Sequence, residues 1–371
     1  MNGVYYVEGL DLHSGQNMGI EQKVLQQIKC LKNLGKLKVM DIKFEQRFTE
    51  KIKFTLPFIK SEREVRREKL FDVLDEKIDY IYIRKPSLSI GFYRLLKKIK
   101  KKFPSVYIIL EIPTYPFHFE YNGMSKLRRL KSKRCEKRLK KVLDKIVTYS
   151  DDEEIWGVPT LRMSNCVAYN DILPRSKEYA LIEGVIRLTC VARFMYWHGV
   201  DRLIEGIKRY DGDYDIELNI VGDGPEIEHL KKLAKNVAGI VFHGKKFGEE
   251  LSEIFNKTDI AVDALGRHRS GVYYNSSLKG KEYVARGIPV ISAVRTELDN
   301  MKDFPYYLKL PADDSCIDVK KVVKFYERIY SKKSPEEITE FIREETDILF
   351  DYKYGFEEVI YNELLSGGGQ Q

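Results

Sequence analysis

The chain has 371 residues and lacks any apolar run that approaches the roughly 20 residues needed to span a bilayer. Its N-terminal stretch, MNGVYYVEGLDLHSG, has no basic segment followed by an apolar one, so no signal peptide is indicated. Its five cysteines are scattered without a CxxC pair, which indicates neither a disulfide framework nor a zinc site. We therefore expect a cytoplasmic protein.

A glycine-rich dinucleotide fingerprint is also absent. No G-x-G-x-x-G follows the first predicted strand of either half of the chain, which disfavours a Rossmann-type dehydrogenase. The hydrophobic content of 43% is ample for packed cores and argues against disorder. The length favours two domains over one.

Charge is distributed unevenly between the two halves. Residues 1–170 carry a net charge of +14, and the remainder carries −6. The basic residues cluster at 97–102 and 126–145, and the second stretch has apolar residues at helical intervals. This pattern fits a solvated helix face over a core, or attraction to an anionic membrane surface or lipid-linked phosphate. Nucleic acid is disfavoured because the patch lacks interleaved aromatics and a reader motif.

Predicted strands and helices alternate throughout, which is typical of parallel sheets covered by helices on both faces. Predicted strands of the first half are 4–10, 38–42, 79–84, 106–112, 145–150 and 163–170. Those of the second half are 185–192, 215–222, 239–244, 259–265 and 289–293. Helices are expected at 20–34, 62–76, 94–102, 126–145 and 200–207.

Two doubly wound, Rossmann-like domains that meet at a cleft are the natural architecture for this pattern. The expected domains are 1–170 and 185–345, joined by a linker at 171–184 that contains Pro174 and Ser176. The tail SGGGQQ, residues 366–371, is of low complexity and is expected to be disordered. Ligands of such sheets bind beyond the carboxyl ends of the strands.

The run SSLKGKEYVARGIPVIS, residues 276–292, has the chemistry of a nucleotide site. Ser276, Ser277, Leu278 and Lys279 open a predicted helix, and helix N-termini attract anions such as phosphate. Glu282 projects from nearly the same helix face and can accept hydrogen bonds from a diol.

Two further loops at predicted strand ends could hold a diphosphate. Arg193 follows the strand 185–192, and His198 and Gly199 open the next helix. Gly222 and Gly224 belong to a Gly-Asp-Gly-Pro turn that allows close backbone approach to a ligand, although such a turn is common for structural reasons alone.

Taken in order, four segments resemble the C-terminal half of GT-B glycosyltransferases, specifically glycosyltransferase family 4 (glycosyl transferases group 1), and exopolysaccharide- or capsule-type members within it. These segments are VARFMYWHGVDRLIEGI, LNIVGDGPEIEHL, VFHGKKFGEELSEIFNKTDIAV and SSLKGKEYVARGIPVIS. In the first half, SGQNMGIEQKVLQQIKCLKNLG resembles the glycine loop and first helix of that family's acceptor domain, and EIPTYPF resembles a loop of exopolysaccharide-type members.

The resemblance implies a retaining enzyme that transfers a sugar from a nucleotide-diphosphate donor, with UDP among the expected nucleotides. It implies that residues 1–170 bind the acceptor, that 185–345 bind the donor, and that a helix at 346–365 crosses back onto the first domain. By carry-over, Arg193 binds the diphosphate and Glu282 holds the ribose hydroxyls. Gly15 and Gly19 lie in the loop whose amides would face the phosphates.

The sequence departs from the family pattern at three positions. His198 stands where the family has lysine, and it carries full charge only below its ordinary pKa near 6.5. Tyr274 stands at the position of a first glutamate, and Cys166 stands where glycine is common. Lys279 fits a subgroup pattern and compensates for lost positive charge.

Catalysis is expected to rest on donors placed where the leaving diphosphate develops charge, with Arg193 and Lys279 foremost. Glu111 and His118 are both candidates for the general base. The alternative explanation for Glu111 is a satisfied carboxylate at a strand end, and that for His118 is membership of an aromatic cluster.

No metal and no cofactor are expected, because GT-B enzymes generally stabilise the leaving group without a bound metal. The DGD at 211–213 matches the Asp-x-Asp metal motif of the other large glycosyltransferase fold, but a surface turn is expected there.

The main hypothesis is a transferase peripheral to the inner face of the cell membrane that builds surface polysaccharide on a lipid-linked saccharide acceptor. A transferase with a soluble acceptor and a catalytically inactive sugar-nucleotide-binding protein are the alternatives.

Overall fold

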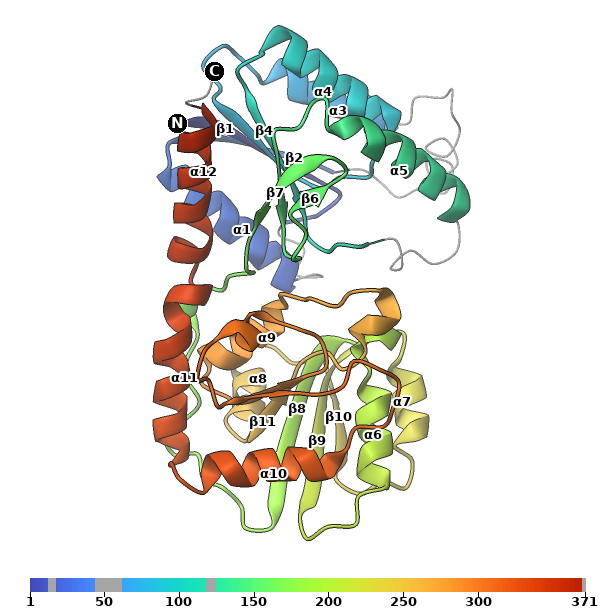
Figure 1. Cartoon of the computed structure of the whole chain (residues 1–371), viewed down its shortest axis with the longest axis vertical. Helices are drawn as coiled ribbons and strands as arrows, with labels where there is room; N and C mark the ends of the chain where they lie inside the picture. The colour runs from blue at the N-terminus through green and yellow to red at the C-terminus, as the bar shows by residue number, and fades with distance from the viewer. Residues whose placement is uncertain (13–17, 44–61, 118–124, 369–371) are drawn as a thin grey trace. The chain divides into compact units, whose positions relative to one another are not determined.

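The computed structural model describes residues 1–12, 18–43, 62–117 and 125–368 (Figure 1). The chain divides into two compact units, one of residues 1–164 with 352–371 and one of residues 165–351. Each unit is built around its own sheet of mainly parallel strands. The predicted α/β architecture with two parallel-sheet domains is therefore confirmed.

Among the described residues, the first unit has seven strands in the order β2-β1-β3-β4-β5-β7-β6. Neighbouring strands run parallel except for the β6–β7 pair, which is antiparallel. The strands are β1 (Asn2–Glu8), β2 (Lys36–Ile42), β3 (Tyr80–Arg84), β4 (Tyr107–Ile112), β5 (Lys145–Thr148), β6 (Glu154–Ile155) and β7 (Val158–Arg162).

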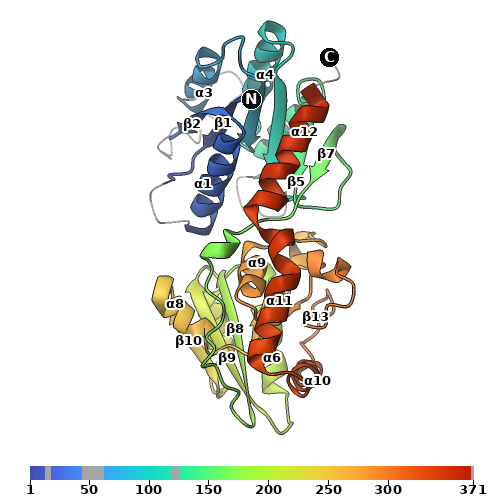
Figure 2. The same cartoon turned by 90° about the vertical axis from the view of Figure 1, so that its left-hand side faces the viewer.

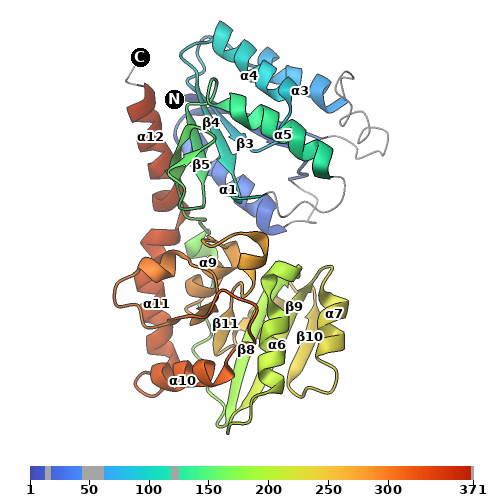
Figure 3. The same ribbon diagram turned by 45° about the vertical axis from the view of Figure 1, so that its right-hand side comes forward.

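Helices cover both faces of this sheet, as right-handed crossovers between parallel strands require (Figures 1 and 3). On one face lie α1 (Met18–Asn33) and α12 (Glu358–Gly368). On the other lie α3 (Glu62–Asp72), α4 (Ile90–Lys102) and α5 (Ser125–Leu139). The helix α4 buries Phe92, Leu95 and Leu96, which recur at helical spacing, and it leaves four of its five lysines exposed.

The second unit has a parallel sheet in the order β10-β9-β8-β11-β12-β13. The strands are β8 (Val185–Arg193), β9 (Asp215–Asp223), β10 (Ile240–Gly244), β11 (Ile260–Val262), β12 (Val290–Ser292) and β13 (Tyr307–Lys309). The helices α6 (Val200–Lys208) and α7 (Ile227–Leu233) cover one face, and α8 (Gly248–Phe255) and α9 (Leu278–Ala285) cover the other (Figure 1). Because every strand is parallel, the loops after β8, β9 and β11 emerge at one edge.

The last helices belong to different units. The helix α10 (Val319–Tyr330) packs near α6, and α11 (Pro335–Phe350) packs against α9 (Figure 2). The α11 N-terminus is closed by a capping box between Ser334 and Glu337. A π-helical turn (Lys353–Glu357) and α12 belong to the first unit.

The crossover helix predicted over 346–365 lies in the first unit from residue 352 onward, as expected, but it is interrupted at its start. The helix α11 ends at Phe350, and Asp351 has an extended conformation before the π turn begins. The expected disorder of the tail also differs from the structure, because α12 continues to Gly368. Gly367 lies against the ring of Tyr107, which gives this end of the helix a packing partner. Residues 369–371 lie outside the described residues.

Two predicted boundaries in the first half require correction. The strand expected at 163–170 does not form: the preceding strand, β7, ends at Arg162, and the backbone at Asn165 and Val167 bonds within the second unit, to Ser276 and Phe350. The helix expected at 126–145 ends at Leu139, and turns then lead into β5.

Residues 171–184, expected as a linker, form part of the second unit. Arg175, 2% exposed, ties this segment down by donating to the carbonyls of Thr258 and Pro335 and to the hydroxyl of Thr339. In the ranges that the structure describes, no helix is both long and apolar enough to cross a bilayer.

Candidate active site

The N-terminus of α9 lies after β11 at the carboxyl edge of the second sheet. Ser277 is its N-cap: its hydroxyl accepts from the Gly280 amide at 3.0 Å and donates to Asp263 Oδ1 at 2.8 Å. Leu278 is the first helical residue. The Ser276 hydroxyl instead accepts from the backbone N–H of Asn165 at 2.7 Å, so this buried side chain anchors the chain segment at 165.

Lys279 contributes a cation to the first turn of α9. Its Nζ lies 3.7 Å from Asp263 Oδ1 and 4.0 Å from Cys190 Sγ, and its side chain is 16% exposed. Asp263 holds both the N-cap serine and the lysine. Sequence reasoning missed Asp263, although a carboxylate directly after a buried strand was a visible signal.

His198 is held as a neutral imidazole by its surroundings. The backbone N–H of Met195 donates to its Nδ1 at 2.9 Å, which leaves the ring proton on Nε2. Burial, together with the charges of Lys279 and Arg267, places the pKa of His198 well below its ordinary 6.5. His198 can therefore offer an anion a neutral N–H donor, and it cannot supply the charge of the lysine that it replaces.

The loop that carries His198 is fixed by close backbone packing. Gly199 has φ +67°, and a Cβ at this position would lie 2.5 Å from the Gly266 nitrogen. The Leu265 amide donates to the His198 carbonyl at 2.9 Å. Arg267, which follows directly, is 7% exposed and lies over the Trp197 ring. It adds a cation that sequence reasoning did not identify.

Arg193 is the last residue of β8, and it is exposed. In the parallel register it stands opposite Asp223, the last residue of β9. Arg193 thus stands at the same sheet edge as the start of α9.

The two glycines of the Gly-Asp-Gly-Pro turn are required by packing between strands. A Cβ on Gly222 would lie 1.9 Å from the Ala192 carbonyl oxygen, and one on Gly224 would lie 2.3 Å from the Phe194 carbonyl oxygen. Both residues also have φ above +130°. This steric requirement explains both glycines whether or not a ligand approaches the turn.

Glu282 lies on the side of α9 that faces α8. Its Oε1 accepts from Arg286 Nη2 at 3.0 Å, and the Arg286 guanidinium lies over the Phe255 ring of α8. The Glu282 side chain remains 31% exposed. A ligand diol would thus meet a carboxylate already oriented by an arginine.

In the first unit, Glu111 lies at the end of β4 and is completely buried. Lys23 Nζ lies 2.9 Å and Arg84 Nη1 3.1 Å from its Oε1, and the Tyr149 hydroxyl donates to the same oxygen at 2.9 Å. Burial alone raises the pKa of this carboxyl, but the two cations outweigh burial and lower the pKa to about 2. Such a carboxylate is a poor proton acceptor.

The other candidates of the first unit are less defined. Gly19 lies near the start of α1, and no heavy atom comes within 4 Å of where its Cβ would be. Gly15 and His118 lie outside the described residues.

The DGD at 211–213 forms a turn before β9, where Asp211 pairs with Lys320 at 2.8 Å. Among the described residues, no three histidine, cysteine or acidic side chains gather in a way that could hold a metal ion.

Residues 186–303 match the family described as "Glycosyl transferases group 1". No curated protein matches the chain.

Solved structures match over almost the whole chain. A glycosyltransferase from Rickettsia africae is 14% identical, with a TM-score of 0.62 and coverage of 98% of both chains. A sucrose-phosphate synthase from Thermosynechococcus elongatus is 15% identical, with a TM-score of 0.63 and coverage of 99% of this chain and 100% of that one. The Anabaena protein HepE, solved with UDP and glucose, is 10% identical, with a TM-score of 0.58 and coverage of 99% and 100%.

At these identities the matches show the fold alone. The chain therefore has the GT-B fold, and its second unit contains a match to a glycosyl transferases group 1 domain over residues 186–303.

Proposed function

We propose that the protein is a retaining glycosyltransferase that moves a hexosyl group from a nucleotide-diphosphate sugar to a saccharide acceptor. The observation that carries this proposal is the set of donors around the N-terminus of α9. Lys279 belongs to the first turn of α9, Arg193 ends β8, and the neutral His198 belongs to the turn before α6, so all three stand at the carboxyl edge of the second sheet. The group 1 match covers these residues, and HepE, a protein of the same fold, was solved with UDP and glucose.

The chemistry follows from charge. When the bond between the sugar and the diphosphate breaks, the diphosphate gains negative charge, and fixed donors stabilise it in the transition state by several kcal/mol. Lys279 and Arg193 supply full charges, His198 supplies its Nε2–H, and the first amides of α9 supply a partial charge. As this bond breaks, the acceptor hydroxyl bonds to the anomeric carbon and gives up its proton. Glu111 is unsuited to accept that proton, because its pKa is lowered to about 2.

The donor site is tested by Arg193→Ala and Glu282→Ala, measured by donor hydrolysis and by sugar transfer. Arg193→Ala is expected to lower the rate by about 100-fold, as removal of one transition-state donor does. Lys235→Ala, an exposed lysine after α7, is the matched control and should leave the rate unchanged. Wild-type rates in both site variants would contradict the assignment. Retention is tested separately by NMR of the product's anomeric proton.

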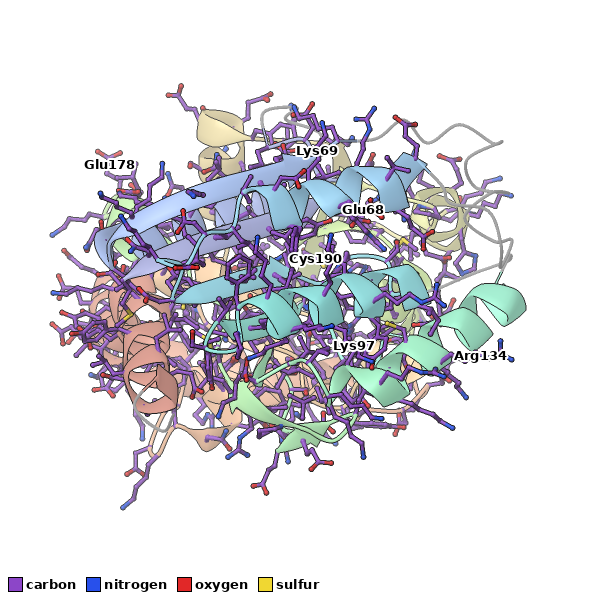
Figure 4. The ribbon with its side chains drawn as sticks, turned by 90° about the horizontal axis from the view of Figure 1, so that it is seen from above. Glu68, Lys69, Lys97, Arg134, Glu178 and Cys190 are labelled. Atoms are coloured by element: carbon purple, nitrogen blue, oxygen red, sulfur yellow. The ribbon has the colours of Figure 1, made fainter. Side chains whose placement is uncertain are left out.

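We also propose that the acceptor is lipid-linked and that the first unit lies on an anionic membrane surface. The support is the basic face formed by α4 and α5, which carry Lys97 and Arg134 (Figure 4). In α4 there is no acidic residue, and Lys98 and Lys102 lie over the Phe71 ring. Surface attraction of this kind contributes about 1 kcal/mol per basic residue near the membrane.

Vesicle binding tests the membrane proposal independently of catalysis. Vesicles with 30% phosphatidylserine should co-sediment the protein at low salt and release it at high salt, because screening weakens the attraction. Neutral vesicles are the control. Absence of binding to the anionic vesicles, together with transfer to soluble saccharides, would favour the soluble-acceptor alternative.

A further inference from the structure

Arg286, the residue after α9, is held in place by groups from two helices. Its Nε and Nη2 lie 3.2 and 3.0 Å from Glu282 Oε1 on α9. On the side of α8, its guanidinium lies 4.4 Å from the centroid of the Phe255 ring, and its Nη1 donates to the Ser252 hydroxyl at 3.4 Å. A planar guanidinium with a ring on its face and acceptors at its edge has one orientation.

This ion pair differs from an ordinary pair of neighbouring turns on a helix surface. In the Arg66–Glu62 pair of α3, both side chains are at least 40% exposed, and pairs of that kind contribute little because water screens them. The Arg286 side chain is only 10% exposed, whereas that of Glu282 is 31% exposed. The cation is thus enclosed between the helices, and the carboxylate that it holds opens to solvent.

The two oxygens of the Glu282 carboxylate have different surroundings. Both bonds from Arg286 end on Oε1. Within the ranges that the structure describes, Oε2 has no protein donor. An ionised carboxylate has about four acceptor positions, so Oε2 keeps its full capacity for a ligand. Because Oε1 is fixed, a hydroxyl that reaches Oε2 meets a side chain whose freedom is already lost, and binding does not have to order it.

We propose that Arg286 is a positioning residue for the donor nucleotide: it fixes Oε1 of Glu282 so that Oε2 accepts from the ribose hydroxyls, and it thereby makes the site selective for nucleotides that carry those hydroxyls. This inference rests on the proposed donor site, in which Glu282 meets the ribose. Arg286 acts through Glu282 and does not itself touch the ligand.

Equilibrium binding by calorimetry tests the inference. Free UDP, GDP and dTDP first identify the nucleotide that binds, and this nucleotide is then compared with its 2′,3′-dideoxy form, which lacks both hydroxyls. The wild type is expected to bind the parent nucleotide at least tenfold tighter, because a hydrogen bond to a charged group is lost in the dideoxy form. The ratio of the two affinities is the readout, since a change in fold or in charge near the diphosphate weakens both nucleotides alike.

Variants assign the ratio to Arg286. Arg286→Met keeps an apolar chain beside Phe255 but has no donor, and it should lower the ratio to about threefold or less. Arg286→Gln, which is too short to keep both bonds to Oε1, is the second variant if the methionine variant does not fold, and the same ratio is expected. Arg209→Met is the matched control with an unchanged ratio, since Arg209 is exposed at the end of α6 that lies away from the site.

A double variant tests whether Arg286 acts through the carboxylate. Glu282→Ala should bring the ratio close to one, and Arg286→Met added to Glu282→Ala should leave it there. A purely structural role of Arg286 would instead weaken binding of both nucleotides and preserve the ratio.

The outcomes separate the two proposals. A wild-type ratio near one, a tenfold ratio that persists in Arg286→Met or Arg286→Gln, or a further change in the double variant would overturn this inference while nucleotide binding stands. Failure of every nucleoside diphosphate to bind would instead overturn the proposed function.

Discussion

Replacement of Glu111 by glutamine should destabilise the first unit by about 3 kcal/mol at neutral pH. Glu111 is fully buried, and its Oε1 serves Lys23 and Arg84 at 2.9 and 3.1 Å. Lowering the pKa of this carboxyl from its ordinary 4.5 to about 2 corresponds to about 3 kcal/mol at pH 7. Removing one partner of a buried ion pair costs a similar amount, about 3–5 kcal/mol, because the remaining charges are left uncompensated.

The pH dependence gives the sign of the effect. Because the pKa of Glu111 is lower in the folded protein than in the unfolded chain, its contribution is fully present above about pH 4.5 and is lost as the pH falls toward about 2. The gap between wild type and Glu111→Gln should therefore shrink to about 1.5 kcal/mol at pH 3.

Two tryptophans allow each unit to be followed by fluorescence. The chain has two, Trp156 in the first unit and Trp197 in the second. Urea unfolding in a Trp197→Phe background reports on the first unit alone, which avoids treating a two-unit chain as a single transition. Glu153→Gln is the matched control, since the Glu153 side chain is 85% exposed. A loss below about 1 kcal/mol in Glu111→Gln, or one equal to the control, would refute the ion-cluster reasoning.

Three further predictions concern the second unit. Gly224→Ala should lower the free energy of unfolding of the second unit by about 2–4 kcal/mol, because φ is +140° and the new Cβ would clash with the Phe194 backbone. Urea unfolding followed by Trp197 fluorescence measures this loss, and a loss under about 1 kcal/mol would contradict the prediction. Ser277→Ala should cost about 1 kcal/mol in the same assay through loss of the N-cap, whereas an unchanged midpoint would show that the cap is dispensable. Because His198 is neutral, nucleotide-sugar affinity should change in parallel in wild type and His198→Asn between pH 6 and 8; a rise toward pH 6 in calorimetry that only the wild type shows would contradict this.

The sequence predicted most of the architecture because the relevant signals are local. Buried strands such as β4 read as continuous apolar runs, and α6 places Val200, Leu203 and Ile204 on one buried face. Helix ends were less predictable. The break between α11 and α12 has neither proline nor glycine at Asp351 to mark it.

The candidate site was predictable where function follows from a local motif. The helix start with Ser277 and Lys279 was identified from the sequence because an N-cap and a first-turn lysine are neighbours in the chain. The protonation of His198 was not, since it depends on the Met195 amide and on burial.

Partners that are distant in sequence were beyond prediction. Glu111 was expected as a possible base. Its lowered pKa could not be predicted, because the two cations that cause it, Lys23 and Arg84, approach Glu111 only in the folded sheet. Gly222 was expected to serve a ligand, and its packing against Ala192 appears only when β8 and β9 pair.

The most direct test of the donor site is calorimetric binding of UDP, GDP and dTDP to the wild type and to Lys279→Ala, with Lys235→Ala as control. One nucleoside diphosphate should bind the wild type and the control equally. Lys279→Ala should bind it at least tenfold more weakly, about 1.4 kcal/mol, because the removed charge lies at the helix start. Absence of binding to the wild type, or equal affinity in Lys279→Ala, would contradict the assignment of this helix start as the diphosphate site.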